Sequence, residues 1–174
     1  MTYAWTQGGP TIFGITTFTL IHVVVSLVGI VAGLVVAGGL TAGRLLDRWS
    51  AVFLVTTIVT NASGFGFPFV TLLPSHVLGV ISLVVLPVVA VAHHVKHFAG
   101  AWRRIYALGV VLATYFNVFV LVTQLFRKVP ALLISAPTQS EPPFAIAQIL
   151  VLALFVWLAV GADKGFRPAP AGRI

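Results

Sequence analysis

The chain has 174 residues, of which 59% are hydrophobic and only 7% are charged, and its formal net charge is +7. With a mean hydropathy of +1.10, it has too few polar residues to cover a water-soluble fold. The chain contains no cysteine, which excludes disulfides, iron–sulfur clusters and thioether-linked haem. Its basic residues flank apolar segments, so we expect anionic lipid headgroups, and no nucleic acid, as their partners.

Five long apolar runs, separated by short gaps that hold most of the charges, predict five membrane-spanning helices. Each crossing of a hydrocarbon core of about 30 Å needs roughly 20 apolar residues. The predicted helices are Phe13–Gly43, Ala51–Phe67, Pro74–Phe98, Arg104–Phe126 and Phe144–Ala162. The expected fold is therefore all-α, a polytopic transmembrane bundle that forms a single domain over residues 1–174.

The distribution of Lys and Arg between alternate gaps predicts the orientation of the bundle. These residues accumulate on the cytoplasmic side of bacterial membrane proteins. Arg127 and Lys128 occupy one side, and the other side holds the remaining eight: Arg44, Arg48, Lys96, Arg103, Arg104, Lys164, Arg167 and Arg173. We therefore expect the N-terminus outside and the C-terminus in the cytoplasm of a bacterial inner (cytoplasmic) membrane.

Small residues repeat at intervals of four along the first predicted helix. Gly29, Gly33 and Ala37 form one such series, and Gly39 and Gly43 repeat the spacing. Small residues at this spacing let a neighbouring backbone approach closely. We predict that this face packs against another helix of the same bundle, and association with other membrane subunits or with a second copy is the alternative.

Two histidines within the apolar segments are candidate ligands, because ionisable residues inside a membrane are costly and mark functional sites. His22 precedes Arg44 by 22 residues, and His76 precedes Lys96 by 20. Measured from these basic ends, both imidazoles lie at similar depth near the outer face. Opposed imidazoles can bind a haem iron or line a quinone pocket. Measured from the centres of the apolar runs, the match in depth is lost.

Three further polar residues fall near the same outer level: Gln124, Glu141 and Gln148. Together with His22 and His76 they predict a polar pocket able to hold a haem b or a quinone headgroup, or to coordinate copper or zinc. The alternative is that each of them bonds a loop carbonyl or faces interfacial water.

Polar residues elsewhere in the spans support more ordinary roles. His93 and His97 are four residues apart and could share a metal, but a solvated cluster with His94 beside the basic residues explains them as well. Asn61 and Asn117 lie deeper in their segments. We predict that their amides form hydrogen bonds between helices.

The acidic residues exclude much familiar chemistry. Only Asp47, Glu141 and Asp163 are present, and the two aspartates fall on the side opposite Glu141. No pair of carboxylates is therefore available for hydrolysis. The sequence also lacks a P-loop, a G-x-S-x-G elbow and an HExxH motif, so it assigns no catalytic residue.

Four segments carry a resemblance to a known group of proteins: LIHVVVSLVG at Leu20–Gly29, GFGFPF at Gly64–Phe69, LPSH at Leu73–His76 and PTQSEPP at Pro137–Pro143. Through them the chain resembles the small multi-pass inner-membrane proteins of bacteria, a family with no assigned activity. The resemblance implies membrane location and no functional residues.

The favoured hypothesis is a membrane-embedded electron-transfer or ligand-binding subunit, in which His22 and His76 hold a b-type haem or line a quinone site. An accessory subunit that stabilises a larger membrane complex, without a cofactor of its own, is the alternative. A small transporter is the third.

Overall fold

A computed structural model describes residues 11, 12, 15–67 and 74–167 of the chain. Within these residues it contains six helices and one short antiparallel hairpin. The elements are β1 (Thr11–Ile12), β2 (Ile15–Thr16), α2 (Thr17–Thr41), α3 (Asp47–Gly64), α4 (Pro74–His94), α5 (Trp102–Lys128), α6 (Pro130–Ser135) and α7 (Pro142–Gly165).

Four of the helices are long and apolar enough to cross a membrane. They are α2, the His76–His94 part of α4, α5 and α7. The remaining long helix, α3, has 18 residues and begins with the charged pair Asp47 and Arg48. The protein is therefore a small, helical, multi-pass membrane protein in contact with a lipid bilayer.

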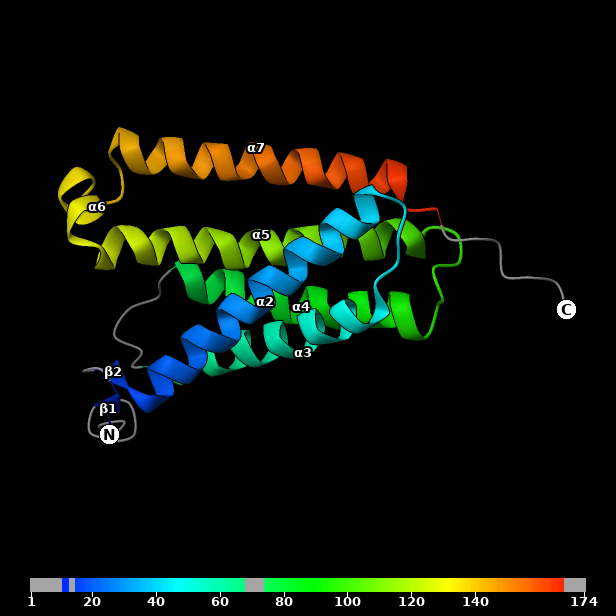
Figure 1. The fold of residues 1–174 in the computed structure, drawn as a ribbon, viewed down its shortest axis with the longest axis horizontal. Helices are drawn as coiled ribbons and strands as arrows, with labels where there is room; N and C mark the ends of the chain where they lie inside the picture. Colours follow the sequence, from blue (N-terminus) through cyan, green and yellow to red (C-terminus); the bar gives the residue numbers. More distant parts are fainter. Residues whose placement is uncertain (1–10, 13–14, 68–73, 168–174) are drawn as a thin grey trace, which may run out of the picture.

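The five long helices lie side by side and run in alternating directions, with α2 crossing the others obliquely (Figure 1). α2 packs against α3, α5 and α7, and α4 packs against α3 and α5. One end of the bundle carries β1, β2 and α6, and we call it the hairpin end. The opposite end, where α2 and α7 finish, carries Arg44, Arg48, Lys96 and Lys164, and we call it the basic end.

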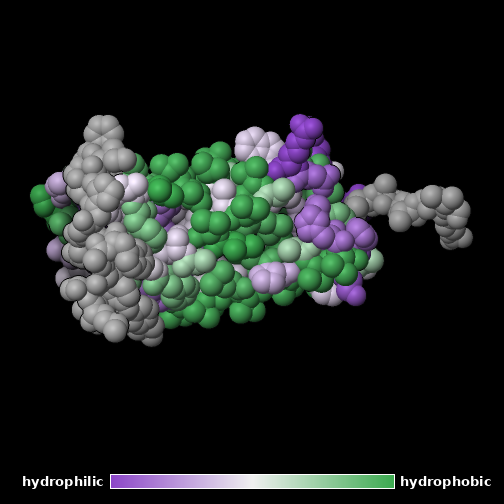
Figure 2. All heavy atoms as spheres, turned by 90° about the horizontal axis from the view of Figure 1, so that it is seen from below, coloured by the Kyte–Doolittle hydropathy of each residue, from purple (hydrophilic) through white to green (hydrophobic). Residues whose placement is uncertain are grey.

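The surface between the two ends is apolar. Figure 2 shows a broad hydrophobic belt, with hydrophilic residues gathered at the basic end. Large aliphatic side chains such as Val84 and Leu150 are exposed on it, as expected for residues that face lipid tails.

The Gly29, Gly33 and Ala37 series of α2 packs inside the bundle, which confirms that part of the prediction, whereas Gly43 lies beyond the helix and is exposed. Gly29, Gly33 and Ala37 are all buried within the single chain. A Cβ added at Gly33 would lie 2.3 Å from Thr114 Oγ1 on α5 and 3.0 Å from a ring carbon of Phe53 on α3. Glycine is therefore required where α2, α3 and α5 meet.

Several helix ends differ from the prediction, for local physical reasons. The first helix begins at Thr17 rather than Phe13, because β1 and β2 pair before it and the Thr16 hydroxyl accepts the Thr19 N–H as an N-cap. It ends at Thr41, two residues before Gly43, which adopts a φ of +72° suited to glycine. The short helix α6, with Pro130 in its first turn, was not predicted.

Ion pairs fasten the helices together at the basic end. Arg103 donates to the carbonyl oxygens of Asp163 and Phe166, and so caps the end of α7. Its neighbour Arg104 binds the Asp163 carboxylate at 2.8 and 2.9 Å. Close by, the Tyr106 hydroxyl forms a 2.7 Å hydrogen bond with Ser50 of α3. Charged and polar side chains at the basic end thus connect α5 to α3 and α7.

Candidate functional site

His22 projects from α2 toward the end of α3, where it is held by a hydrogen bond. Its Nδ1 lies 2.8 Å from Ser63 Oγ, and the same hydroxyl lies 3.1 Å from the carbonyl oxygen of Thr60. A carbonyl can only accept, so the single Ser63 proton is donated to Thr60. With both bonds formed, His22 donates its Nδ1–H to Ser63, and in the neutral imidazole Nε2 then carries the free lone pair.

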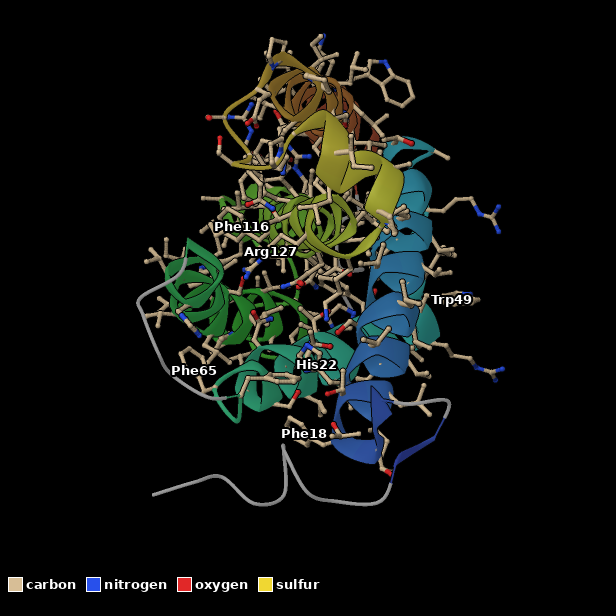
Figure 3. The ribbon with its side chains drawn as sticks, turned by 90° about the vertical axis from the view of Figure 1, so that its left-hand side faces the viewer. Phe18, His22, Trp49, Phe65, Phe116 and Arg127 are labelled. Carbon is tan, nitrogen blue, oxygen red and sulfur yellow. The ribbon has the colours of Figure 1, made fainter. Side chains whose placement is uncertain are left out.

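The unprotonated Nε2 of His22 has no hydrogen-bond partner among the residues that the structure describes. The ring is half-buried and packs edge-on against Phe67, with centroids 5.0 Å apart, and the Phe67 ring also packs against Phe18, again with centroids 5.0 Å apart. Figure 3, viewed from the hairpin end, shows His22 directed from α2 toward the bundle interior, above Phe18. A free nitrogen lone pair in aromatic surroundings can accept a proton donor or bind a metal.

His76 lies at the start of α4, also beside the end of α3. Its ring is 6.2 Å from that of Phe65, and one turn further along α4 a Cβ added at Gly79 would meet Phe65 and Asn61. His22 instead contacts Ser63 and Phe67. The two histidines therefore lie at the same end of the bundle but contact different sides of the α3 terminus.

The other three predicted site residues lie around α5 and α7. Gln148 donates from Nε2 to the Phe119 carbonyl at 3.2 Å and to Thr123 Oγ1 at 3.4 Å, which ties α7 to α5. The Glu141 carboxylate binds groups of its own loop, and Gln124 is half-buried on α5. The hydrogen bonds thus join Gln148 to α5 and Glu141 to its own loop, rather than either of them to His22.

Glu141 closes the loop that leads into α7. It accepts hydrogen bonds from the hydroxyl and the N–H of Thr138 and from the N–H of Ser140. Desolvation by neighbouring atoms raises the pKa of Glu141, but these hydrogen bonds together outweigh it and hold the pKa below its ordinary value.

We expect this loop to loosen at acidic pH. A carboxyl whose pKa is lowered in the folded state stabilises that state fully above its unfolded pKa, and the effect is lost as pH falls through the lowered pKa. Amide protection of Thr138 and Ser140, measured by NMR across that range, should fall with pH. Glu141→Gln should show weak protection at every pH, and an unchanged pH dependence in the variant would contradict the assignment.

The histidines at the basic end do not form the paired metal site that their spacing allows. Helix α4 ends at His94, and His97 lies beyond it with a φ of 45°, so the one-turn geometry of His93 and His97 is not formed. His93 Nε2 instead lies 2.9 Å from an Asp47 oxygen of α3. Among the described residues, no group of three or more His, Asp or Glu side chains is placed to hold a metal.

Sequence reasoning missed Ser63 and did not predict the surroundings of Asn61 and Asn117. Ser63, the partner of His22, lies in an Asn-Ala-Ser-Gly run whose polarity was the only available signal. The prediction for Asn61 was wrong, because its Nδ2 bonds the Thr57 carbonyl of its own helix at 2.8 Å. Asn117 Nδ2 is buried without a partner within the described structure.

Comparison with known proteins does not assign the chain to a family. No protein-family model matches the chain, and no curated sequence or solved structure is significantly similar to it. The fold and the resemblance drawn from the sequence therefore agree only at the level of class, a small helical protein with four candidate membrane spans.

Proposed function

We propose that the protein is a membrane-embedded electron-transfer or ligand-binding subunit whose ligand is held by His22 near the outer face of a bacterial inner membrane. The observation that carries this proposal is the hydrogen bond between His22 Nδ1 and Ser63, which selects one tautomer of the neutral ring. Ser63 and Thr60 hold the Nδ1–H, so that Nε2 presents a lone pair. A hydrogen bond to the ring nitrogen that does not bind the ligand is what orients a ligand-binding imidazole.

A quinol headgroup suits this nitrogen best. A quinol hydroxyl can donate to an unprotonated Nε2, and its ring can pack against Phe67, which meets His22 edge-on, and against Phe18, which packs on Phe67. A b-type haem would use the same lone pair and would take His76 as its second axial ligand. That arrangement also requires both imidazoles to face one cavity, whereas they contact different sides of the α3 terminus.

The proposal includes a fifth span, α3, with the N-terminus outside and the C-terminus in the cytoplasm. With 18 residues, α3 is about 27 Å long, close to the thickness of a hydrocarbon core. Its first residue, Asp47, is paired with His93 near the end of α4, and Ser63 near its other end reaches His22. These two contacts support a helix that runs the full depth of the bundle.

The test measures what the protein carries when it is purified from bacterial membranes in mild detergent. We expect extracted quinone at a near-stoichiometric ratio, and His22→Ala should lower it at least tenfold. Ser63→Ala removes only the partner of Nδ1 and should lower the quinone content less, because Ser63 orients the imidazole without contacting the ligand. A reduced-minus-oxidised absorption spectrum of the same samples reports haem, whose bands should vanish in His22→Ala if haem is the ligand.

The matched control is His97→Asn, at the opposite end of the bundle. His97 is exposed with a φ of 45°, and asparagine tolerates this backbone conformation. Its ligand content should equal that of the parent. Ligand content that survives His22→Ala would contradict the site, and parent protein without quinone or haem would favour the accessory-subunit function instead.

A further inference from the structure

Four buried polar groups in the middle of the bundle have no hydrogen-bond partner among the described residues. They are Thr57 Oγ1 and Thr60 Oγ1 on α3, Ser82 Oγ on α4 and Asn117 Nδ2 on α5. Thr57 and Ser82 are 0% exposed, and Thr60 and Asn117 are 9% exposed. Buried polar groups in proteins are nearly always paired, with protein or with ordered water.

Close approaches between the helices place these four groups at one level, which means within about one helical turn of one another along the axis of the bundle. A Cβ added at Gly29 of α2 would lie 3.3 Å from Thr57 Oγ1, and one at Gly33 would lie 2.3 Å from Thr114 Oγ1. Since α2 and α5 run in opposite directions, Asn117, three residues after Thr114, lies about one turn from Gly33 toward the level of Gly29.

The packing of α4 against α5 brings Ser82 to the same level. A Cβ added at Gly109 of α5 would lie 2.4 Å from Val89 of α4. Ser82 comes seven residues before Val89, and Asn117 comes eight residues after Gly109. Because α4 and α5 run in opposite directions, these two displacements lead toward the same end of the bundle. Ser82 and Asn117 therefore lie at nearly the same height along its axis. Thr60 lies about one turn from Thr57 on α3.

The two threonines of α3 do not make the bond that helical threonines usually make. A buried Thr or Ser side chain in a helix commonly donates to the carbonyl four residues earlier. Thr114 does so to Val110 at 2.7 Å, and Thr123 does so to Phe119 at 3.0 Å. The hydroxyls of Thr57 and Thr60 make no such bond, so they are available to a bound molecule.

The side chains at this level favour a small neutral molecule over an ion. The segments 49–67, 77–92 and 105–126 contain no Asp, Glu, Lys or Arg, so an ion would be buried without a counter-charge, which is strongly unfavourable. Three hydroxyls can donate or accept, and the amide N–H donates. Water can both donate and accept, and buried water typically makes about three such bonds.

We propose that Thr57, Thr60, Ser82 and Asn117 form a binding site for internal water, a hydrated layer in the middle of an otherwise apolar bundle. The layer lies next to the hydrogen bonds of His22, since the Thr60 carbonyl accepts from Ser63. The site does not depend on the identity of the His22 ligand. It predicts water at mid-membrane depth, where lipid-facing residues have none.

Water-edited solid-state NMR of the labelled protein in lipid bilayers tests this site. We expect magnetisation from water to reach the Asn117 side-chain amide and the β carbons of Thr57, Thr60 and Ser82 at least twice as fast as it reaches Thr114. Thr114 is the matched control, because it is as buried as Thr57 and Ser82 but bonds its own helix. Transfer at the four positions as slow as at Thr114 would overturn the proposal.

A variant tests whether the four groups share the water. Asn117→Leu removes one side of the site and should slow the transfer to the other three residues at least twofold, with Thr114 unchanged. Ser82→Ala, a smaller change, serves the same purpose if the leucine variant does not fold. If a folded variant shows unchanged transfer of water magnetisation to the remaining residues, the shared site is overturned.

Discussion

Replacing Gly33 with alanine is expected to destabilise the protein by about 1–3 kcal/mol, the usual range for overpacking a core. The added methyl would lie 2.3 Å from Thr114 Oγ1 and 2.8 Å from its Cγ2. Thr114 cannot easily move aside, because it is fully buried and its hydroxyl bonds the Val110 carbonyl. Gly33→Leu should have a larger effect, since its longer side chain would overlap further with Thr114 and Phe53, which an alanine Cβ already approaches.

Thermal unfolding in detergent, followed by circular dichroism, measures this effect. The matched control is Gly38→Ala in the same helix, where an added Cβ would meet nothing within 4 Å. Alanine favours a helix over glycine by up to about 1 kcal/mol, so the control should melt at or above the parent temperature. Equal melting of Gly33→Ala and Gly38→Ala would show that α2 does not pack as described.

Most of the helical architecture could be predicted because a membrane span needs a long apolar run whatever its neighbours are. The predicted fourth helix, Arg104–Phe126, lies wholly within α5, and the fifth, Phe144–Ala162, lies within α7. The helix ends were harder, because they depend on caps and loop geometry. The predicted third helix continued to Phe98, whereas in the structure His97 and Phe98 both adopt positive φ and the helix stops at His94.

The partners of the candidate site residues could not be predicted, for a reason specific to membranes. In a water-soluble helix the apolar stripe identifies the buried face, but here the lipid-facing side is as apolar as the core. Val84 is exposed while Val89 is buried, although the sequence does not distinguish them. Only small and polar residues, such as Gly33 and Asn117, mark the inner face. The sequence singled out His22 as a candidate ligand but could not identify Ser63 as its partner.

Reporter fusions are expected to divide the loops of the chain into two sets with opposite, nearly all-or-none signals. In the proposed topology, fusions ending at Ala42 and Gly100 lie in the cytoplasm, and those ending at Gly66 and Ala136 lie outside. Eight of the ten Lys and Arg residues belong to the cytoplasmic set, and such a bias orients membrane proteins strongly. Alkaline phosphatase should be active only at the second pair of sites, and green fluorescent protein should fluoresce only at the first.

The comparison of Ala42 with Gly66 decides whether α3 spans the membrane, because only this helix separates the two fusion points. Opposite signals are expected if α3 spans it. The same signal at both points would reduce the protein to its four most apolar helices and place both termini on one side. Opposite signals with the reverse assignment would keep five spans but move His22, at the hairpin end, to the cytoplasmic face. An outer-face quinol or haem site would then be excluded, whatever ligand the purified protein carries.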